Sequence, residues 1–255
     1  MEQRFSISAA VDFGRQKYKE NFGYWMKVYG ILLAIFIVYV VIGLPFDEHN
    51  PITKLIDLIY QLINIYLTMG LIKIAVGTID DNRPPVSALF TSRSRFWSYF
   101  GASLMINISA GFLALVAIIP IMLWSDLWFA FILLLIPSAY ILIRWAFFGY
   151  LVVDKEMNAS AAMGMSWDIT EGCVLQIIGF GITMVGIILL GTLALGIGLF
   201  VALPVTELAT AHAYRQLVAA HMPVDPDPLA LQETAAASPD IAYTHEPDDP
   251  LAGES

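Results

Sequence analysis

The sequence predicts an all-α polytopic membrane protein, with six transmembrane helices arranged as three hairpins. Each hairpin is expected to follow a short amphipathic helix lying at the cytoplasmic interface. Three observations predict this class: an apolar composition, six long apolar stretches, and three similar segments that precede them. Of the 255 residues, 58% are apolar and only 14% are charged, whereas a soluble domain carries about a quarter charged residues. Such a chain has too few polar side chains to cover a core in water.

Six stretches meet or approach the length of about 20 mostly apolar residues that a membrane crossing requires. They are 28–44, 52–76, 99–123, 127–153, 173–196 and 197–218. The first has no charged residue, and the second is the most polar, with Lys54, Asp57 and Lys73 inside it. Because the last two stretches are contiguous, Gly196 and Gly198 are expected to make the turn between them.

The distribution of basic residues predicts the orientation of these spans. The side that carries both termini holds the following Lys and Arg residues: Arg4, Arg15, Lys17, Lys19, Lys27, Lys73, Arg83, Arg93, Arg95 and Lys155. The opposite side has only Lys54, at the edge of a span. Basic residues concentrate on the cytoplasmic side, so both termini are predicted to be cytoplasmic. The polar, basic segment 1–27 does not resemble a cleavable signal peptide.

Composition divides the chain into a six-helix transmembrane domain, 1–221, and an acidic C-terminal tail, 222–255. The tail holds eight acidic residues and no Lys or Arg, out of a net charge of −9 for the chain. A segment so poor in apolar residues is predicted to be disordered. Nucleic acid is an unexpected partner, because binding its backbone requires a basic surface that neither part supplies.

Three segments preceding the odd-numbered spans share a pattern that predicts an internal repeat. They begin at Ser8, Ser87 and Ser160, each followed by Ala and then by apolar residues at helical spacing. The apolar faces consist of Ile7, Ala10, Val11, Gly14 and Tyr18; of Val86, Leu89, Phe90 and Trp97; and of Ala162, Met163, Met165 and Ile169. Each stretch is too short to span a bilayer, and helices of this kind lie in its interface.

Polar residues within the spans are candidate functional residues, because burying them in a membrane is costly. Arg144 either extends its charge to the cytoplasmic interface beside Trp145, which the sequence favours, or pairs with Glu207 or a polar residue of the third interfacial helix. Glu207, Asn64 and Asn107 lie near mid-depth. They form either a structural hydrogen-bond cluster, the favoured interpretation, or part of a proton or ion relay.

The interfacial helices carry basic residues beside their apolar faces. Arg15 and Lys17 on the first and Arg93 on the second can reach lipid phosphates, so anionic lipid headgroups are predicted partners, together with a possible membrane-protein partner. The acidic pair Asp80 and Asp81 precedes Pro84 and is interpreted as a turn and helix cap rather than as a metal site.

No catalytic, nucleotide-binding or metal-binding motif occurs in the sequence, so no enzymatic activity and no cofactor are predicted. Cys173 is the single cysteine. The favoured function is that of a membrane scaffold, or of a module that interacts with lipids or a partner. The alternative is a small-solute or ion transporter that uses the polar residues at mid-depth.

The second half of the chain also resembles a known family. The residues that carry the resemblance are Ile136-Pro137, Arg144-Trp145, Phe147, Leu151-Val152-Val153-Asp154, Ala161-Ala162, Ser166-Trp167, Thr170-Glu171-Gly172, Pro204 and Ala213-Tyr214-Arg215-Gln216-Leu217. They resemble the YciC-like bacterial six-helix membrane proteins of unknown function. That family is related to the membrane domain fused to some glycerophosphoryl diester phosphodiesterases. The resemblance implies a six-helix fold in a bacterial inner membrane and supplies no activity.

Overall fold

The computed structural model describes residues 6–47, 49–90, 95–123, 137, 139–194 and 196–221, without the side chains of 112–123. The internal contacts divide the chain into Met1–His221 and Met222–Ser255. Every described residue belongs to the first unit. The prediction of a disordered tail over 222–255 therefore lies outside the described residues.

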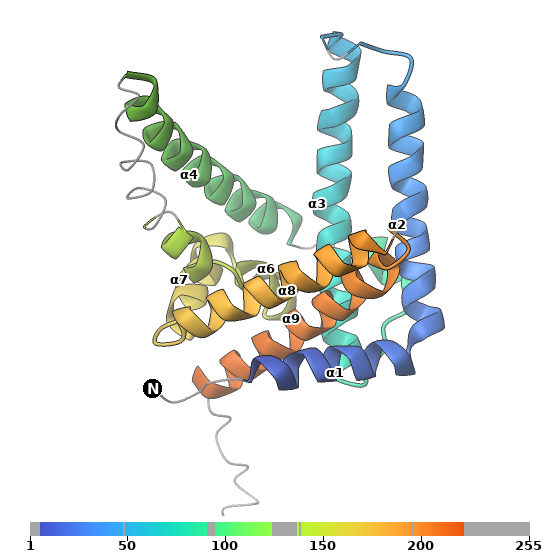
Figure 1. Cartoon of the computed structure of the whole chain (residues 1–255), viewed down its shortest axis with the longest axis vertical. Helices are drawn as coiled ribbons and strands as arrows, with labels where there is room; N and C mark the ends of the chain where they lie inside the picture. The colour runs from blue at the N-terminus through green and yellow to red at the C-terminus, as the bar shows by residue number, and fades with distance from the viewer. Residues whose placement is uncertain are drawn as a thin grey trace, which may run out of the picture. The chain divides into compact units, whose positions relative to one another are not determined.

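All regular secondary structure in the described residues is helical, which confirms the all-α class. In chain order the elements are α1 (Ile7–Glu20), α2 (Phe22–Gly43), α3 (Pro51–Ile79), the 3₁₀ helix η1 (Val86–Phe90), α4 (Phe96–Leu123), α6 (Phe148–Asp154), α7 (Ala159–Ile169), α8 (Val174–Leu193) and α9 (Leu199–His221) (Figure 1). Of the helices in the described part, α2, α3 and α8 are long and apolar enough to cross a membrane.

Side-chain caps define where three of the helices begin. The hydroxyl of Ser6 accepts a hydrogen bond from the amide of Ala9 at the start of α1. Asn50 accepts one from Ile52 at the start of α3, and Asn158 accepts one from Ala161 at the start of α7, both at 2.9 Å. Such caps satisfy amides that have no partner within the helix. The sequence-based assignment of Asn158 to a helix start is confirmed.

The helices α2 and α3 lie side by side and expose much apolar surface (Figure 1). Tyr39 of α2 stacks on Tyr60 of α3 with ring centroids 3.9 Å apart, and its hydroxyl donates to Asp57 at 2.9 Å. Only 6% of the most apolar window of α2 is buried by the rest of the protein. An apolar surface this extensive is typical of a lipid-facing helix.

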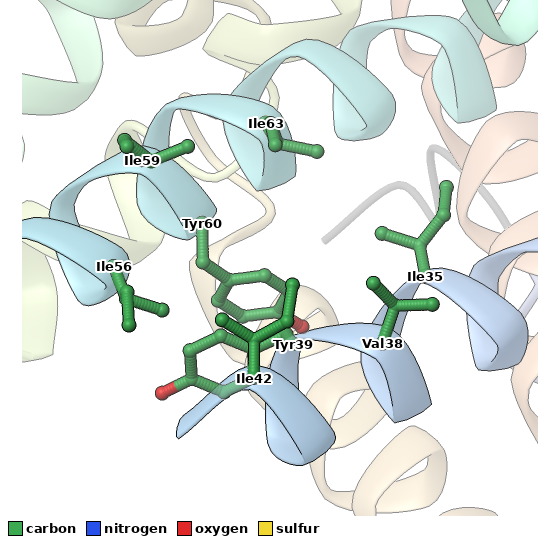
Figure 2. A pocket seen from close by; sticks show the side chains of 8 residues that line it. All are labelled: Ile35, Val38, Tyr39, Ile42, Ile56, Ile59, Tyr60 and Ile63. Atoms are coloured by element: carbon green, nitrogen blue, oxygen red, sulfur yellow. The ribbon is translucent and has the colours of Figure 1, made fainter. Parts of the chain in front are cut away.

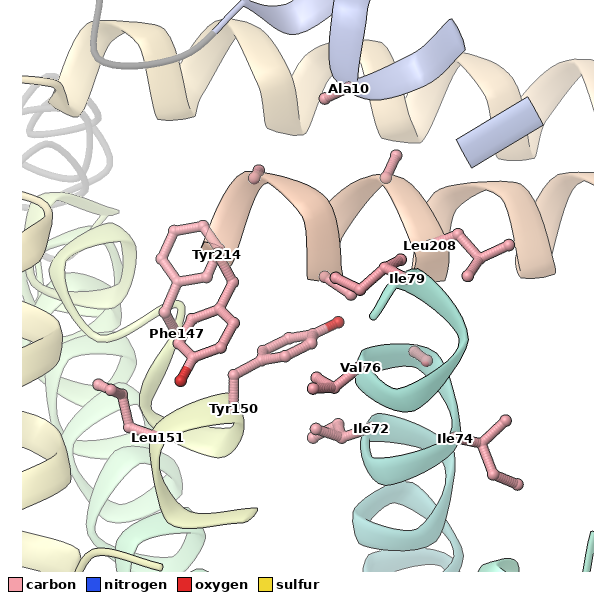
Figure 3. Close-up of a cluster of buried hydrophobic side chains, with 14 of the residues drawn as sticks. Ala10, Ile72, Ile74, Val76, Ile79, Phe147, Tyr150, Leu151, Leu208 and Tyr214 are labelled. Carbon is pink, nitrogen blue, oxygen red and sulfur yellow. The ribbon is translucent and has the colours of Figure 1, made fainter. Parts of the chain in front are cut away.

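The core lies where α3, α6 and α9 meet (Figure 3). Phe147, Tyr150 and Tyr214 form a group of neighbouring rings, with Tyr150 and Tyr214 stacked at 5.2 Å. Ile72 and Val76 of α3 face this group from the other side. The core therefore joins helices that are distant in the sequence.

Equivalent positions of the three similar segments are buried in the same way. Ala10, Leu89 and Ala162, each two residues after the initial serine, are all 0% exposed. The predicted apolar faces of α1 and α7 are confirmed, since Gly14, Tyr18, Met163 and Ile169 are also buried.

The same contact between elements also recurs three times. The element η1 packs on α3, α7 packs on α6, and α1 packs on α9. A Cβ atom at Gly70 would clash with the backbone of Leu89, and one at Gly14 would lie 2.7 Å from the carbonyl oxygen of Val205. Next to the remaining pair, the Ser166 hydroxyl of α7 donates to the carbonyl of Arg144, four residues before α6 begins, at 2.9 Å.

On the side of the preceding helical regions these contacts fall at matching positions along the chain, whereas on the segments Gly14 and Ser166 lie six residues after the initial serine and Leu89 lies two. Gly70 lies ten residues before Asp80, Arg144 ten before Asp154, and Val205 ten before Arg215. Two of the contacts join a segment to the helical region preceding it, whereas α1, the first described helix, packs on α9, the last described helix. The recurrence supports the predicted internal repeat independently of the sequence match.

Two sequence-based expectations differ from the structure. A single helix over 86–97 is not formed. Residues Val86–Phe90 form the 3₁₀ helix η1, and Trp97 belongs to α4. The pair Pro84-Pro85 lacks amide donors, and the amide of Ala88 bonds to Pro85 in a tight turn. Of the predicted apolar face, Leu89 is buried, but Phe90 and Trp97 are exposed.

The predicted span 127–153 is interrupted. Residues 139–144 are helical, 145–147 form a turn, and α6 begins at Phe148. The hydroxyl of Ser166 accepts a hydrogen bond from the amide of Phe147 at 3.3 Å and donates to the carbonyl of Arg144. A side chain from α7 thus satisfies backbone groups that a continuous helix would pair internally. The first part of this span, through 136, lies outside the described residues.

Candidate functional site

The ends of α3, α6 and α9 are joined by a cluster of charged residues around Arg215. The guanidinium donates to both carboxylate oxygens of Asp154 at 2.7 and 2.8 Å, and to both of Asp80 at 2.5 and 3.2 Å. The hydroxyl of Tyr214 also donates to Asp154, at 2.8 Å. Two-oxygen recognition of a carboxylate is the geometry for which a guanidinium is best suited. We call Arg215, Asp80, Asp154 and Tyr214 the Arg215 cluster.

A second ion pair lies beside this cluster. The ammonium of Lys17, near the end of α1, donates to Asp81 at 2.5 Å and lies 3.6 Å from Glu20. The hydrogen bond to Asp81 raises the pKa of Lys17 above its ordinary value of 10.5. The predicted turn and helix cap at Asp80 and Asp81 are present, because Asp80 caps α3 and Asp81 has a φ of 57°. The sequence interpretation missed that both carboxylates are paired.

Arg144 is buried, with 3% of the residue exposed. Its guanidinium carbon lies 4.5 Å from the centroid of the Trp167 ring and 5.8 Å from that of Tyr140. The favoured extension to the surface is therefore not observed. No ion pair among the described residues joins Arg144 to Glu207. The neighbour on α7 is an aromatic ring instead of the polar residue considered in the alternative.

The backbone around Arg144 is fixed by hydroxyl groups of α7 and the turn that follows it. Ser166 donates to the Arg144 carbonyl at 2.9 Å, and the hydroxyl of Thr170 lies 3.4 Å from the same oxygen. Both hydroxyl-bearing residues are fully buried. Arg144 and Trp167 are thus held together by contacts of both backbone and side chain.

Glu207 lies on α9 among aromatic residues of other helices. The hydroxyl of Tyr150 donates to its carboxylate at 3.1 Å, and Tyr29 and Tyr99 lie within electrostatic range of the same group. Four elements, α2, α4, α6 and α9, therefore contribute to its surroundings. Among the described residues, Glu207 therefore has one side-chain hydrogen bond, from Tyr150, which is less than the predicted hydrogen-bond cluster.

The two candidate asparagines do not join this cluster. Asn64 and Asn107 are both exposed. The amide of Asn107 donates to the carbonyl of Ser103 on its own helix at 2.7 Å. The described contacts therefore do not bring Arg144, Glu207, Asn64 and Asn107 together into one cluster.

Two of the three residues predicted to contact lipid headgroups, Arg15 and Lys17, lie in the described part of the chain. Arg15 is exposed on α1, whereas Lys17 is engaged with Asp81. Arg93 lies outside the described residues. The apolar face of α1 is covered by α9, so only the opposite face of α1 is exposed. A headgroup role for Arg15, Lys17 and Arg93 stays a prediction.

Apolar hollows flank the helices α2 and α3. One of about 230 Å³ lies between them and is lined by isoleucine, valine and the stacked pair Tyr39 and Tyr60 (Figure 2). Another of about 370 Å³ extends from Tyr29 and Phe36 of α2 to Leu199 and Leu203 of α9. Their linings are suited to aliphatic chains and offer few hydrogen bonds.

Within the described residues, no group of three or more His, Cys, Asp or Glu side chains is placed to hold a metal ion. The candidate functional site is defined by three sets of contacts: the Arg215 cluster, the Arg144–Trp167 contact and the Glu207–Tyr150 contact.

No protein-family model, curated protein or solved structure matches the chain. The resemblance to YciC-like proteins stays a prediction from the residues.

Proposed function

We propose that the chain is a six-span protein of a bacterial inner membrane, with its spans in three hairpins and both termini in the cytoplasm. Six crossings put the N-terminal segment and the ends of spans two, four and six on one side. Lys17, Asp80, Asp154 and Arg215 come from those four places, and ion pairs connect Lys17 to Asp81 and Arg215 to both Asp80 and Asp154. These contacts support an even number of membrane crossings between the N-terminal segment and each of these helix ends.

Reporter fusions test this topology directly. A reporter that is active only in the cytoplasm is expected to function after His221, and one that is active only outside is expected to function at Asp47 and Asp126. An external reporter that functions after His221 would contradict an even number of spans.

Within that topology we propose a membrane scaffold without enzymatic activity, whose surface interacts with lipids or a partner protein. The observation that carries the proposal is the separation of the polar residues. Asn64 and Asn107 are exposed, Glu207 bonds to Tyr150, and Arg144 lies under Trp167. A transport path needs polar groups in succession across the bilayer, and these four supply isolated contacts.

Lipid retention tests the scaffold proposal. The protein purified from native membranes is expected to retain more phosphatidylglycerol or cardiolipin than an Arg15→Gln, Arg93→Gln variant, because each basic residue near an anionic leaflet contributes about 1 kcal/mol. Lys17 is left in place because its loss would also break the pair with Asp81. The control is Lys54→Gln, on the side predicted to be external. Equal retention by all three proteins would refute a lipid-binding role for the basic residues.

A further inference from the structure

Arg144 carries a buried positive charge for which the described residues supply no negative partner. None of the ion pairs among them includes Arg144, and its Nε atom has no hydrogen-bond partner there. An arginine side chain keeps its charge in proteins. Removing that charge from water is strongly unfavourable unless an anion or hydrogen-bond acceptors replace the water.

The carboxylates that could approach are engaged or exposed. Asp154, at the end of α6, is held by Arg215 and Tyr214, and Glu207 accepts from Tyr150. Asp168, next to Trp167, and Glu171, next to Thr170, are exposed and form no ion pair with Arg144 among the described residues. An anion from outside the described part of the chain would therefore complete the site.

The aromatic neighbours restrict the chemistry of that anion. Trp167 and Tyr140 meet edge to face, at 5.9 Å and 85°, and both rings lie within the range at which they attract a cation. Rings compensate part of the charge but do not accept the N–H groups that lie in the guanidinium plane. Those donors form a rigid fork that matches two oxygens of a carboxylate or a phosphate.

The two aromatic neighbours of Arg144 reach the surface of the protein. Tyr140 is 43% exposed, and Trp167 is partly buried. Trp and Tyr concentrate at the level of the lipid headgroups, and α7 is one of the helices predicted to lie at the interface. The anion that a membrane offers in greatest quantity at that level is the phosphate of a phospholipid.

We propose that Arg144, beside Trp167 and Tyr140, binds the phosphate of an anionic phospholipid in the cytoplasmic leaflet. This site rests on the proposed lipid-interacting function and assigns it a specific residue. A hydrogen bond from Ser166 to the Arg144 carbonyl fixes the Arg144 backbone and so orients the guanidinium before the lipid arrives.

The test is a titration of the full-length protein in maltoside micelles, which contain no phosphate. Phosphatidylglycerol is added, and the midpoint of thermal unfolding is recorded, because a ligand that binds the folded state raises it. The wild-type protein is expected to show a saturable rise. Arg144→Gln is expected to need about tenfold to hundredfold more lipid for the same rise, the usual range for hydrogen bonds to a charged group.

A matched control is available in Arg83, whose guanidinium carbon lies 5.8 Å from the ring of Tyr24 but which is exposed. Arg83→Gln is expected to titrate like the wild type. Arg144→Lys keeps the charge and loses the fork, so an intermediate affinity is expected. If Arg144→Gln does not fold, the phosphatidylglycerol titration of Arg144→Lys replaces it as the test. Wild-type affinity in both Arg144 variants would overturn the proposal.

Two further additions to the wild-type protein identify the ligand. Inorganic phosphate alone is expected to have little effect, and an equal rise would assign the phosphate to a soluble source and overturn the lipid assignment. Oleate supplies an anionic amphiphile without phosphate. A rise with oleate as large as that with phosphatidylglycerol would overturn the phosphate assignment.

The retention experiment separates this site from the broader function. Normal titration of Arg144→Gln, together with reduced retention by the Arg15→Gln, Arg93→Gln variant, would refute only the Arg144 site. If the wild-type protein neither retains anionic lipid nor responds to it, the lipid-interacting function fails as well.

Discussion

Arg215 on α9 holds Asp154 at the end of α6 through two hydrogen bonds, from Nη1 at 2.7 Å and from Nη2 at 2.8 Å. The Asp154 side chain is 12% exposed and that of Arg215 is 28% exposed. The same guanidinium also binds Asp80 at the end of α3. One side chain therefore connects three helices that the core also brings together.

Loss of Arg215 is expected to destabilise the protein. Arg215→Gln leaves the largely buried Asp154 with Tyr214 and the longer, exposed ion pair to Lys155, and we expect a loss of about 1–3 kcal/mol in the free energy of unfolding. Thermal unfolding in detergent measures it. Adding Asp154→Asn should recover part of the loss. Lys155→Gln is the control, because its ammonium lies 3.9 Å from Asp154 and is exposed. A loss as large in this control would contradict the assignment.

Gly14 is expected to reject even a methyl group. A Cβ atom there would lie 2.7 Å from the Val205 oxygen and 2.9 Å from the Ala209 amide, and neither backbone atom can move cheaply. Gly14→Ala should therefore cost about 1–3 kcal/mol of stability. Gly23→Ala, in α2 with no atom within 4 Å of the added carbon, should be neutral or stabilising, since Ala favours helices. Equal unfolding midpoints for the two variants would show that α1 does not pack closely on α9.

Alkaline pH is expected to weaken the contact between α1 and the end of α3. Asp81 raises the pKa of Lys17 above 10.5, so the contribution of the pair to stability is complete below 10.5 and is lost as the pH rises through the higher value in the folded protein. The pair is partly exposed, and its worth is at most about 1 kcal/mol. The unfolding midpoints of the wild type and Asp81→Asn should converge above pH 10.5. A difference that stays constant to higher pH would exclude Lys17 as its source.

Substitution of Glu207 distinguishes a scaffold from a transporter. Glu207→Gln keeps an acceptor for the Tyr150 hydroxyl, so a small change in stability is expected. Proteoliposomes loaded with a pH-sensitive dye should show no ion-driven signal above empty liposomes, with either the wild type or the variant. A wild-type proton flux that Glu207→Gln abolishes would establish the transporter alternative.

The helical class and most helix boundaries could be predicted from the sequence because they depend on local signals. Apolar runs give α2, α3 and α8, and Asn158 marks the start of α7. The glycine turn is also as expected: Gly196 has a φ of 76°, and Gly198 approaches Gly191 too closely for a Cβ atom. Each of these features follows from a few neighbouring residues.

The candidate site was less predictable because its partners are distant in the chain. Asp80 and Arg215 are 135 residues apart, and nothing local in either segment specifies the other. The signal that could have revealed them is the repeat, in which Asp80, Asp154 and Arg215 hold matching positions. Arg144 was misjudged for a related reason: the backbone groups at the break at 145–147 are bonded by the hydroxyl of Ser166, which a hydropathy profile does not reveal.

The packing of α1 on α9 has a consequence for biosynthesis. The ribosome makes α1 first and α9 last of the described helices, so Ala10, Gly14 and Tyr18 stay without their covering surface until translation of the helical part is almost complete. Chains that stop before Leu199 would display this uncovered face. An exposed apolar face can mark an unfinished chain for quality-control proteases, and packing by α9 would remove this mark only once the last described helix has been made.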